Sequence, residues 1–88
     1  MSKLQNNGHS AAVRLRLRVN GVELRVAQVG DSFLILRDQA EARPGTVADI
    51  IITVDGNQRV YPVILPEGIF SSSDFVEYLD LNAAPAPH

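Results

Sequence analysis

Apolar and polar residues alternate strictly on both sides of an Asn-Gly pair between residues 13 and 26. Asn20 and Gly21 readily adopt the positive φ angles of a type I′ turn, which joins two antiparallel strands. With these two residues as the loop, Leu17 lies opposite Leu24, and each apolar residue meets an apolar residue on the other strand. The pattern therefore predicts a β-hairpin with one aliphatic face.

The opposite face of this hairpin carries four arginines: Arg14, Arg16, Arg18 and Arg25. The predicted register pairs Arg18 with Glu23, which is favourable, and Arg16 with Arg25, which costs roughly a few tenths of a kcal/mol. The same register places Leu15 opposite Val26.

Two further segments predict a second hairpin. Residues 47–54 form a strand with Ala48, Ile50, Ile52 and Val54 on one face, and residues 59–65 form the next strand. Asp55-Gly56 between them is a turn signal. This signal fits either a two-residue loop, Asp55-Gly56, or a four-residue loop. We favour the longer loop, Asp55 to Gln58, because it places Ile52 opposite Tyr61 and pairs more apolar residues. Pro62 cannot donate to a ladder, which predicts a sheet edge or a strand end there.

Residues 33–37 predict another strand, since they are apolar on both faces. The segment from Asp74 to Leu81 admits two interpretations. Asp74 and Glu77 are spaced as a capping box for a short helix, whereas the alternation and the aromatic and β-branched content favour a strand. With the strand, the chain has six, and the prediction is an all-β fold: a small six-stranded antiparallel barrel or sandwich with disordered termini.

The 88 residues suffice for one domain. We expect a disordered leader at 1–11, a single β domain at 12–81 and a disordered Pro/Ala tail at 82–88. There are no cysteines and no apolar run of about 18 residues, so a disulfide scaffold and a membrane partner are not predicted. The start of the chain also lacks the pattern of a secretory signal, and the expected location is the cytoplasm.

The sequence offers no constellation for catalysis. His9 and His88 both fall in the predicted tails, and the serines have no base at a useful spacing. The acids are scattered, and no cysteine can ligate a metal. We therefore expect no enzyme, no cofactor and no metal site.

Charge is distributed unevenly although the net charge is only −2. The first 26 residues are basic, and the remainder is acidic. Guanidinium groups bind phosphate or carboxylate in a bidentate manner, so the four hairpin arginines are the candidate anion- or partner-binding site. Two other interpretations are a plain solvated face and pairing with the chain's own acids Asp74, Glu77 and Asp80. No aromatic residues interleave with the arginines, which argues against a nucleic-acid partner.

From Arg14 to Leu65 the chain resembles PilZ-type β-barrel domains. Arg14 and Arg18 form an Arg-x-x-x-Arg pair, Asp31-Ser32 lies in the turn before an apolar strand, and Pro44-Gly45 follows that strand. The ligand motifs are degenerate, because Asp31 and Ser32 are adjacent. The resemblance implies a β-barrel in which the two arginines and the Asp/Ser turn bind cyclic di-GMP.

The function that we expect is a small non-enzymatic protein-interaction or adaptor module with an unidentified protein partner. The alternative is a degenerate PilZ-like regulator, which would bind an anionic small molecule or a nucleotide on the arginine face of the first hairpin.

Overall fold

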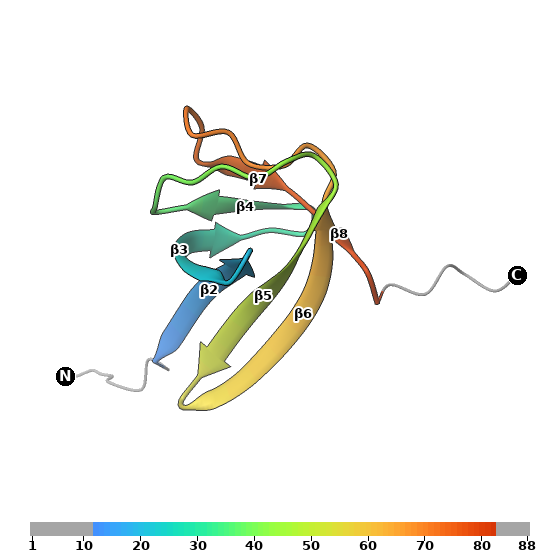
Figure 1. Cartoon of the computed structure of the whole chain (residues 1–88). Coiled ribbons are helices and arrows are strands. Elements are labelled where there is room, and N and C mark those ends of the chain that lie inside the picture. The colour runs from blue at the N-terminus through green and yellow to red at the C-terminus, as the bar shows by residue number, and fades with distance from the viewer. Residues whose placement is uncertain (1–11, 83–88) are drawn as a thin grey trace, which may run out of the picture.

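All strands belong to one antiparallel sheet that curls into a nearly closed barrel (Figure 1). The computed structural model describes residues 12–82, which form seven strands in the order β7-β4-β3-β2-β5-β6-β8. Their bounds are β2 Val13–Val19, β3 Val22–Val29, β4 Phe33–Leu36, β5 Thr46–Val54, β6 Asn57–Leu65, β7 Phe75–Glu77 and β8 Leu79–Asp80. The predicted all-β class is confirmed. The histidines and most of the two predicted disordered segments lie outside the described residues.

The first hairpin has the predicted turn and register. Asn20 and Gly21 have φ angles of 53° and 78°, and Val19 pairs with Val22, followed by three further predicted pairs up to Arg16 with Arg25. Positive φ at both loop positions gives the turn the twist of the strands that it joins. Local turn chemistry and alternation therefore suffice to set this register.

The expected pairing of Leu15 with Val26 is wrong. The register of β2 and β3 ends at Arg16 and Arg25. The residues of β2 before Arg16 pair only with β5, as far as Val13 with Val54. The residues of β3 after Arg25 pair with β4, with a register shift between Val26 and Gln28. An extra residue in one strand bends it away from its neighbour, so the two strands separate.

The preferred register of the second hairpin is also wrong. Val54 pairs with Asn57 and Ile52 with Arg59, so the loop is Asp55-Gly56 alone. The φ angles of Asp55 and Gly56, 51° and 85°, again show two successive left-handed residues. The strong turn signal outweighs the additional apolar pairs that the longer loop would make. Both registers direct the same residues inward, so the core is unaffected.

One continuous segment, Phe75–Leu81, closes the barrel. Its first part, β7, pairs with β4, and its second part, β8, pairs with β6 (Figure 1). The predicted strand is thus confirmed over the helix, and its division at Tyr78 explains why seven strands replace the expected six. The hydroxyl of Tyr78 donates a hydrogen bond to the Gly30 carbonyl. Burial, with smaller contributions from Asp31 and Asp80, raises the pKa of Tyr78.

Pro62 lies where the strand pairing between β6 and β8 stops, as its missing N–H predicts. The β8 residues pair with Val63 and Ile64. Leu81 then donates its N–H to the Pro62 carbonyl at 3.0 Å, and proline has no N–H to return the second bond of an antiparallel pair.

The core consists of the inward residues of the strands and one loop residue. Leu17, Leu34, Val63 and Leu65 have no exposed surface. Ile69 lies in the loop that covers one end of the barrel, where it forms an isolated antiparallel bridge with Ala42. Within residues 12–82 no buried side chain is polar or charged, so apolar burial is the main favourable contribution to folding.

Candidate functional site

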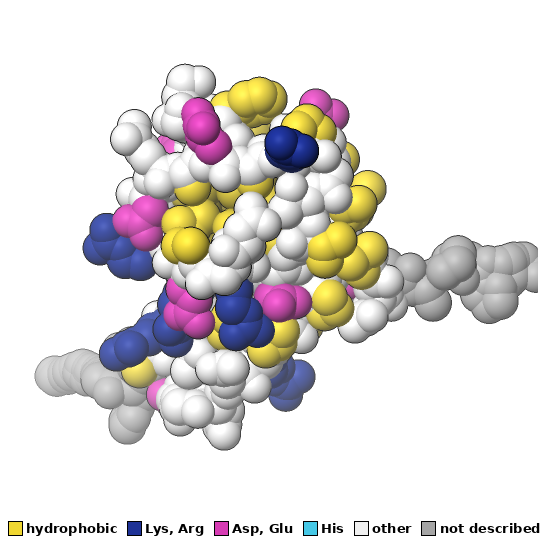
Figure 2. Space-filling view, in the orientation of Figure 1, with side chains coloured by type: hydrophobic (Ala, Val, Ile, Leu, Met, Phe, Trp, Pro, Cys, Tyr) yellow, Lys and Arg dark blue, Asp and Glu magenta, His cyan; other side chains and the backbone are white. Residues whose placement is uncertain are grey.

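The four hairpin arginines lie together on the outer face of the barrel. Arg14, Arg16 and Arg18 alternate along β2, and Arg25 of β3 is the direct neighbour of Arg16. Figure 2 shows Lys and Arg side chains interleaved with Asp and Glu on the side of the molecule where β2 and β3 lie. The predicted cluster is therefore formed, but it includes acidic neighbours.

Three of the four arginines form ion pairs with acids of the same chain. Arg16 contacts Glu23 at 2.7 Å, and Arg18 contacts Asp49 of β5 at 3.3 Å. Because Asp49 is the direct neighbour of Arg18 on β5, Glu23 is left to pair diagonally with Arg16, and the expected Arg18–Glu23 ion pair is not formed.

Arg25 pairs with Asp38, which follows β4. The Nε and Nη2 atoms of Arg25 donate to Oδ1 of Asp38 at 3.1 and 2.7 Å, and the backbone N–H of Arg25 donates to Oδ2 at 2.8 Å. The adjacent arginines Arg16 and Arg25 thus each have a carboxylate, which offsets their mutual repulsion.

The acids that pair with the arginines are not the expected ones. Among the described residues, ion pairs involve Glu23, Asp38 and Asp49 rather than Asp74, Glu77 and Asp80. The latter three belong to the segment that closes the barrel against β4 and β6, whereas the arginines lie on β2 and β3.

Hydrogen bonds from Arg25 hold the pKa of Asp38 below its usual value of 3.8. The side-chain bonds contribute most, and the backbone N–H of Arg25 adds to them. A lowered pKa in the folded state means that the ionised carboxylate stabilises the fold above the unfolded pKa, and that this stabilisation is lost as the pH falls.

We expect the variant Asp38→Asn to be less stable than the wild type near neutral pH and to lose less stability below about pH 4. Urea denaturation at a series of pH values measures both effects. The control is Glu77→Gln, which removes an exposed acid of β7 that forms no ion pair within residues 12–82. Identical acid profiles for Asp38→Asn and the wild type would contradict the assignment.

Arg14 and Arg37 differ from these arginines. Neither forms an ion pair with any residue between 12 and 82. Both line a hollow on the barrel surface, together with Arg16 and Arg25. Sequence reasoning missed Arg37, because its position one residue after β4 gives no sign that β4 lies beside β3.

A second surface consists of exposed and half-buried apolar side chains on the outer face of β5, β6 and β8. We call it the apolar face, and its residues are Val47, Val60, Pro62, Ile64, Leu79 and Leu81. Val47 pairs with Ile64, which pairs with Leu79, so these three form one row across the strands. Figure 2 shows hydrophobic side chains gathered on the side where β6 and β8 lie.

The apolar face is exposed to solvent. Val47 and Leu79 are 58% and 57% exposed, and Val60 and Leu81 are 42% and 48% exposed. The outer face of an antiparallel sheet is ordinarily polar. The sequence signal was present, since residues 47–54 and 59–65 carry apolar side chains at both odd and even positions.

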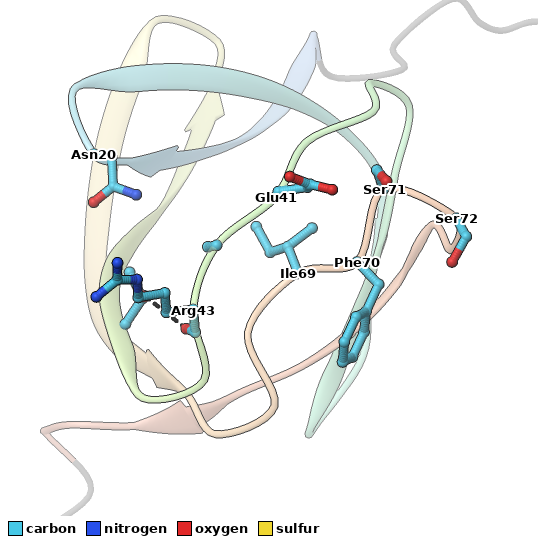
Figure 3. A pocket seen from close by; sticks show the side chains of 9 residues that line it. Asn20, Glu41, Arg43, Ile69, Phe70, Ser71 and Ser72 are labelled. Carbon is cyan, nitrogen blue, oxygen red and sulfur yellow. Dashed lines mark hydrogen bonds between the residues drawn. The ribbon is translucent and has the colours of Figure 1, made fainter.

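A depression at one end of the barrel is lined by loop residues, including Glu41, Arg43 and Phe70 (Figure 3). Ser71 and Ser72 lie at its margin, and Ser73 accepts a hydrogen bond from the N–H of Phe75 at 3.2 Å. The last contact is a local turn bond of the kind that serine commonly makes. The depression thus combines one aromatic ring with charged and short polar side chains.

The residues that the PilZ resemblance singles out are in different parts of the barrel. Arg14 and Arg18 lie on the same face of β2, about 13 Å apart along an extended strand, and Arg18 is bound to Asp49. The turn with Asp31 and Ser32 follows β3, and the Ser32 carbonyl accepts the N–H of Tyr78. This turn therefore takes part in closing the barrel.

Residues 12–82 contain no group of three or more His, Asp or Glu side chains that could hold a metal ion. The same residues include no helix of the length and apolar character needed to cross a membrane.

Comparison with known proteins adds no assignment. No protein-family model matches the sequence, and no curated protein or solved structure matches it.

Proposed function

We propose that this protein is a non-enzymatic protein-interaction module and that its contact surface is the apolar face. The single observation that carries the proposal is the exposure of Val47, Leu79 and their neighbours on one side of the sheet. Contiguous exposed apolar patches on small domains are typical of interaction sites. The cytoplasm is the proposed compartment, on the sequence grounds given above.

The geometry of the strands supports one continuous surface. Val47, Ile64 and Leu79 are direct neighbours on three adjacent strands, and such strands lie about 4.8 Å apart. Leu81 lies beside Pro62 in the next row. A partner that covered these side chains would remove most of their apolar area from water, at roughly 25 cal/mol per Å².

Charged groups border this surface. Asp49 is the direct neighbour of Pro62 on β5 and forms its ion pair with Arg18. Protein interfaces commonly have an apolar centre and a polar rim. The Arg18–Asp49 pair would form such a rim and orient the partner.

Site-specific photocrosslinking tests the proposal. A photoreactive phenylalanine derivative replaces Val47 in the full chain, expressed in cells, and the matched control carries it at Gln39, an exposed loop residue. We expect one discrete protein adduct from position 47 and none from position 39. Adding Leu79→Asp to the position-47 protein should abolish the adduct, since a carboxylate in an apolar contact loses its hydration.

Leu79 is exposed, so Leu79→Asp should leave the fold intact, and circular dichroism checks this. Equal adducts from positions 47 and 39, or an adduct that persists with Leu79→Asp, would overturn the proposed surface.

The alternative is the PilZ-like regulator that binds a nucleotide or another anion through Arg14, Arg16, Arg18 and Arg25. Arg14 forms no ion pair within residues 12–82, which favours the alternative, whereas the ion pair of Arg18 with Asp49 opposes it. Titration of single arginine variants with cyclic di-GMP tests this alternative, as described below.

A further inference from the structure

The hollow between β2 and β3 exists because the two strands separate. Their register ends at Arg16 and Arg25, and β3 bends away between Val26 and Gln28. The residues between the separated strands line an open hollow of about 640 Å³. Ligand pockets are commonly of this size.

The hollow is lined by both apolar and basic residues. Leu15 and Val26, the two residues whose pairing was expected, both line it. Four arginines surround them: Arg14 and Arg16 from β2, Arg25 from β3, and Arg37 from the residue after β4. Arg37 is held beside β3 by its backbone, because its N–H donates to the Arg25 carbonyl at 2.8 Å.

The positive charge around the hollow is only half neutralised. Glu23 pairs with Arg16 and Asp38 pairs with Arg25. Arg14 and Arg37 have no ion-pair partner within the described part of the chain. Two guanidinium groups are therefore available, and a dianion would balance them.

We propose that this hollow binds a small organic phosphate monoester, whose phosphate contacts Arg14 and Arg37 and whose apolar part rests on Leu15 and Val26. A phosphate monoester carries about −1.5 to −2 charges at neutral pH, which matches the two guanidinium groups that have no ion-pair partner within residues 12–82. Guanidinium binds phosphate oxygens in a bidentate manner. The apolar part of the lining discriminates such an ester from free phosphate. This site is separate from the apolar face and does not depend on the proposed interaction function.

Binding of 1-naphthyl phosphate to the full chain, measured by calorimetry at low salt, tests the site. We expect saturable binding that the variant Arg14→Gln with Arg37→Gln weakens about tenfold or more, since two charge-assisted contacts are removed. Arg43→Gln with Arg59→Gln is the matched control, because it removes the same charge from two exposed arginines that form no ion pair within residues 12–82 and do not line the hollow; it should bind as the wild type does. Inorganic phosphate, which lacks the apolar part, should bind at least several-fold more weakly.

Four results would overturn the proposal. These are no saturable binding, wild-type binding by the variant Arg14→Gln with Arg37→Gln, equal weakening by Arg43→Gln with Arg59→Gln, and equal affinity for inorganic phosphate. The melting temperature of each variant without ligand shows that the fold is retained.

A parallel titration of the single variants Arg14→Gln, Arg18→Gln and Arg37→Gln with cyclic di-GMP distinguishes the hollow from the PilZ-like alternative. Cyclic di-GMP binding that requires Arg14 and Arg18 but not Arg37 would replace the proposed site by the alternative. The variant Leu79→Asp should bind 1-naphthyl phosphate normally, so the phosphate site and the apolar face can fail separately.

Discussion

Replacing Leu17 by alanine is expected to lower the free energy of unfolding by about 2–5 kcal/mol. Leu17 has no exposed surface and lies between Leu24 of β3 and Ile50 of β5. Its truncation removes apolar contacts and leaves a cavity that rigid neighbouring strands fill only in part. Small domains have total stabilities of roughly 5–15 kcal/mol, so much of the protein could be unfolded at physiological temperature. Urea denaturation followed by circular dichroism measures the change.

Leu79→Ala is the matched control for this prediction, because it is the same substitution at a side chain that is 57% exposed. We expect it to change stability by less than about 1 kcal/mol. If both variants lost the same stability, Leu17 would not be part of the core that the structure describes.

The variant Gly68→Ala should also be strongly destabilised, by about 3 kcal/mol or more. Gly68 has a φ angle of +70°, and a Cβ atom there would lie 2.2 Å from the backbone oxygen of Ala42. The left-handed conformation alone costs alanine roughly 1–2 kcal/mol. Relieving the clash would also disturb the Ala42–Ile69 bridge, whose two hydrogen bonds measure 3.0 and 2.9 Å.

Gly45→Ala isolates the contribution of the clash. Gly45 has a similar φ angle of +84°, but a Cβ atom there would meet nothing within 4 Å. We expect this variant to lose only the roughly 1–2 kcal/mol of backbone strain. Equal losses in the two variants, measured as urea midpoints, would show that the contact between Gly68 and Ala42 is not tight.

The parts of the fold that were predictable from the sequence are those that short-range chemistry determines. Asn20-Gly21 specifies a turn, and alternation on both sides specifies which residues face the core. The second hairpin shows the limit of counting apolar pairs. Asp55-Gly56 has the same turn chemistry, and this chemistry determines the register although Ile52 then lies opposite Arg59.

The arginine partners could not be predicted, because they depend on which strands become neighbours. Asp49 lies 31 residues from Arg18 and meets it only because β5 packs beside β2. Asp38 meets Arg25 because β4 lies beside β3. A sequence shows that Arg18 and Arg25 are on the same face of a hairpin, but local spacing does not specify the next strand on either side.

The hollow between β2 and β3 could not be predicted from the sequence for a similar reason. Regular alternation through Val26 predicts continued pairing with Leu15, whereas the separation arises because β3 must bend to follow β4. Curvature of this kind is a property of the closed sheet as a whole. The apolar face, in contrast, was visible in the sequence as apolar residues at consecutive positions.

The segment that closes the barrel also determines the order in which the fold can be completed during synthesis. Phe75–Leu81 pairs with both β4 and β6, and the ribosome makes it after all the other strands. Until it emerges, the nascent sheet has two open edges that can pair with other chains. Closure then joins residues more than 40 positions apart, such as Phe33 and Glu77, and such long-range pairing is slow. A newly made chain is therefore most vulnerable to aggregation just before its last strand is released.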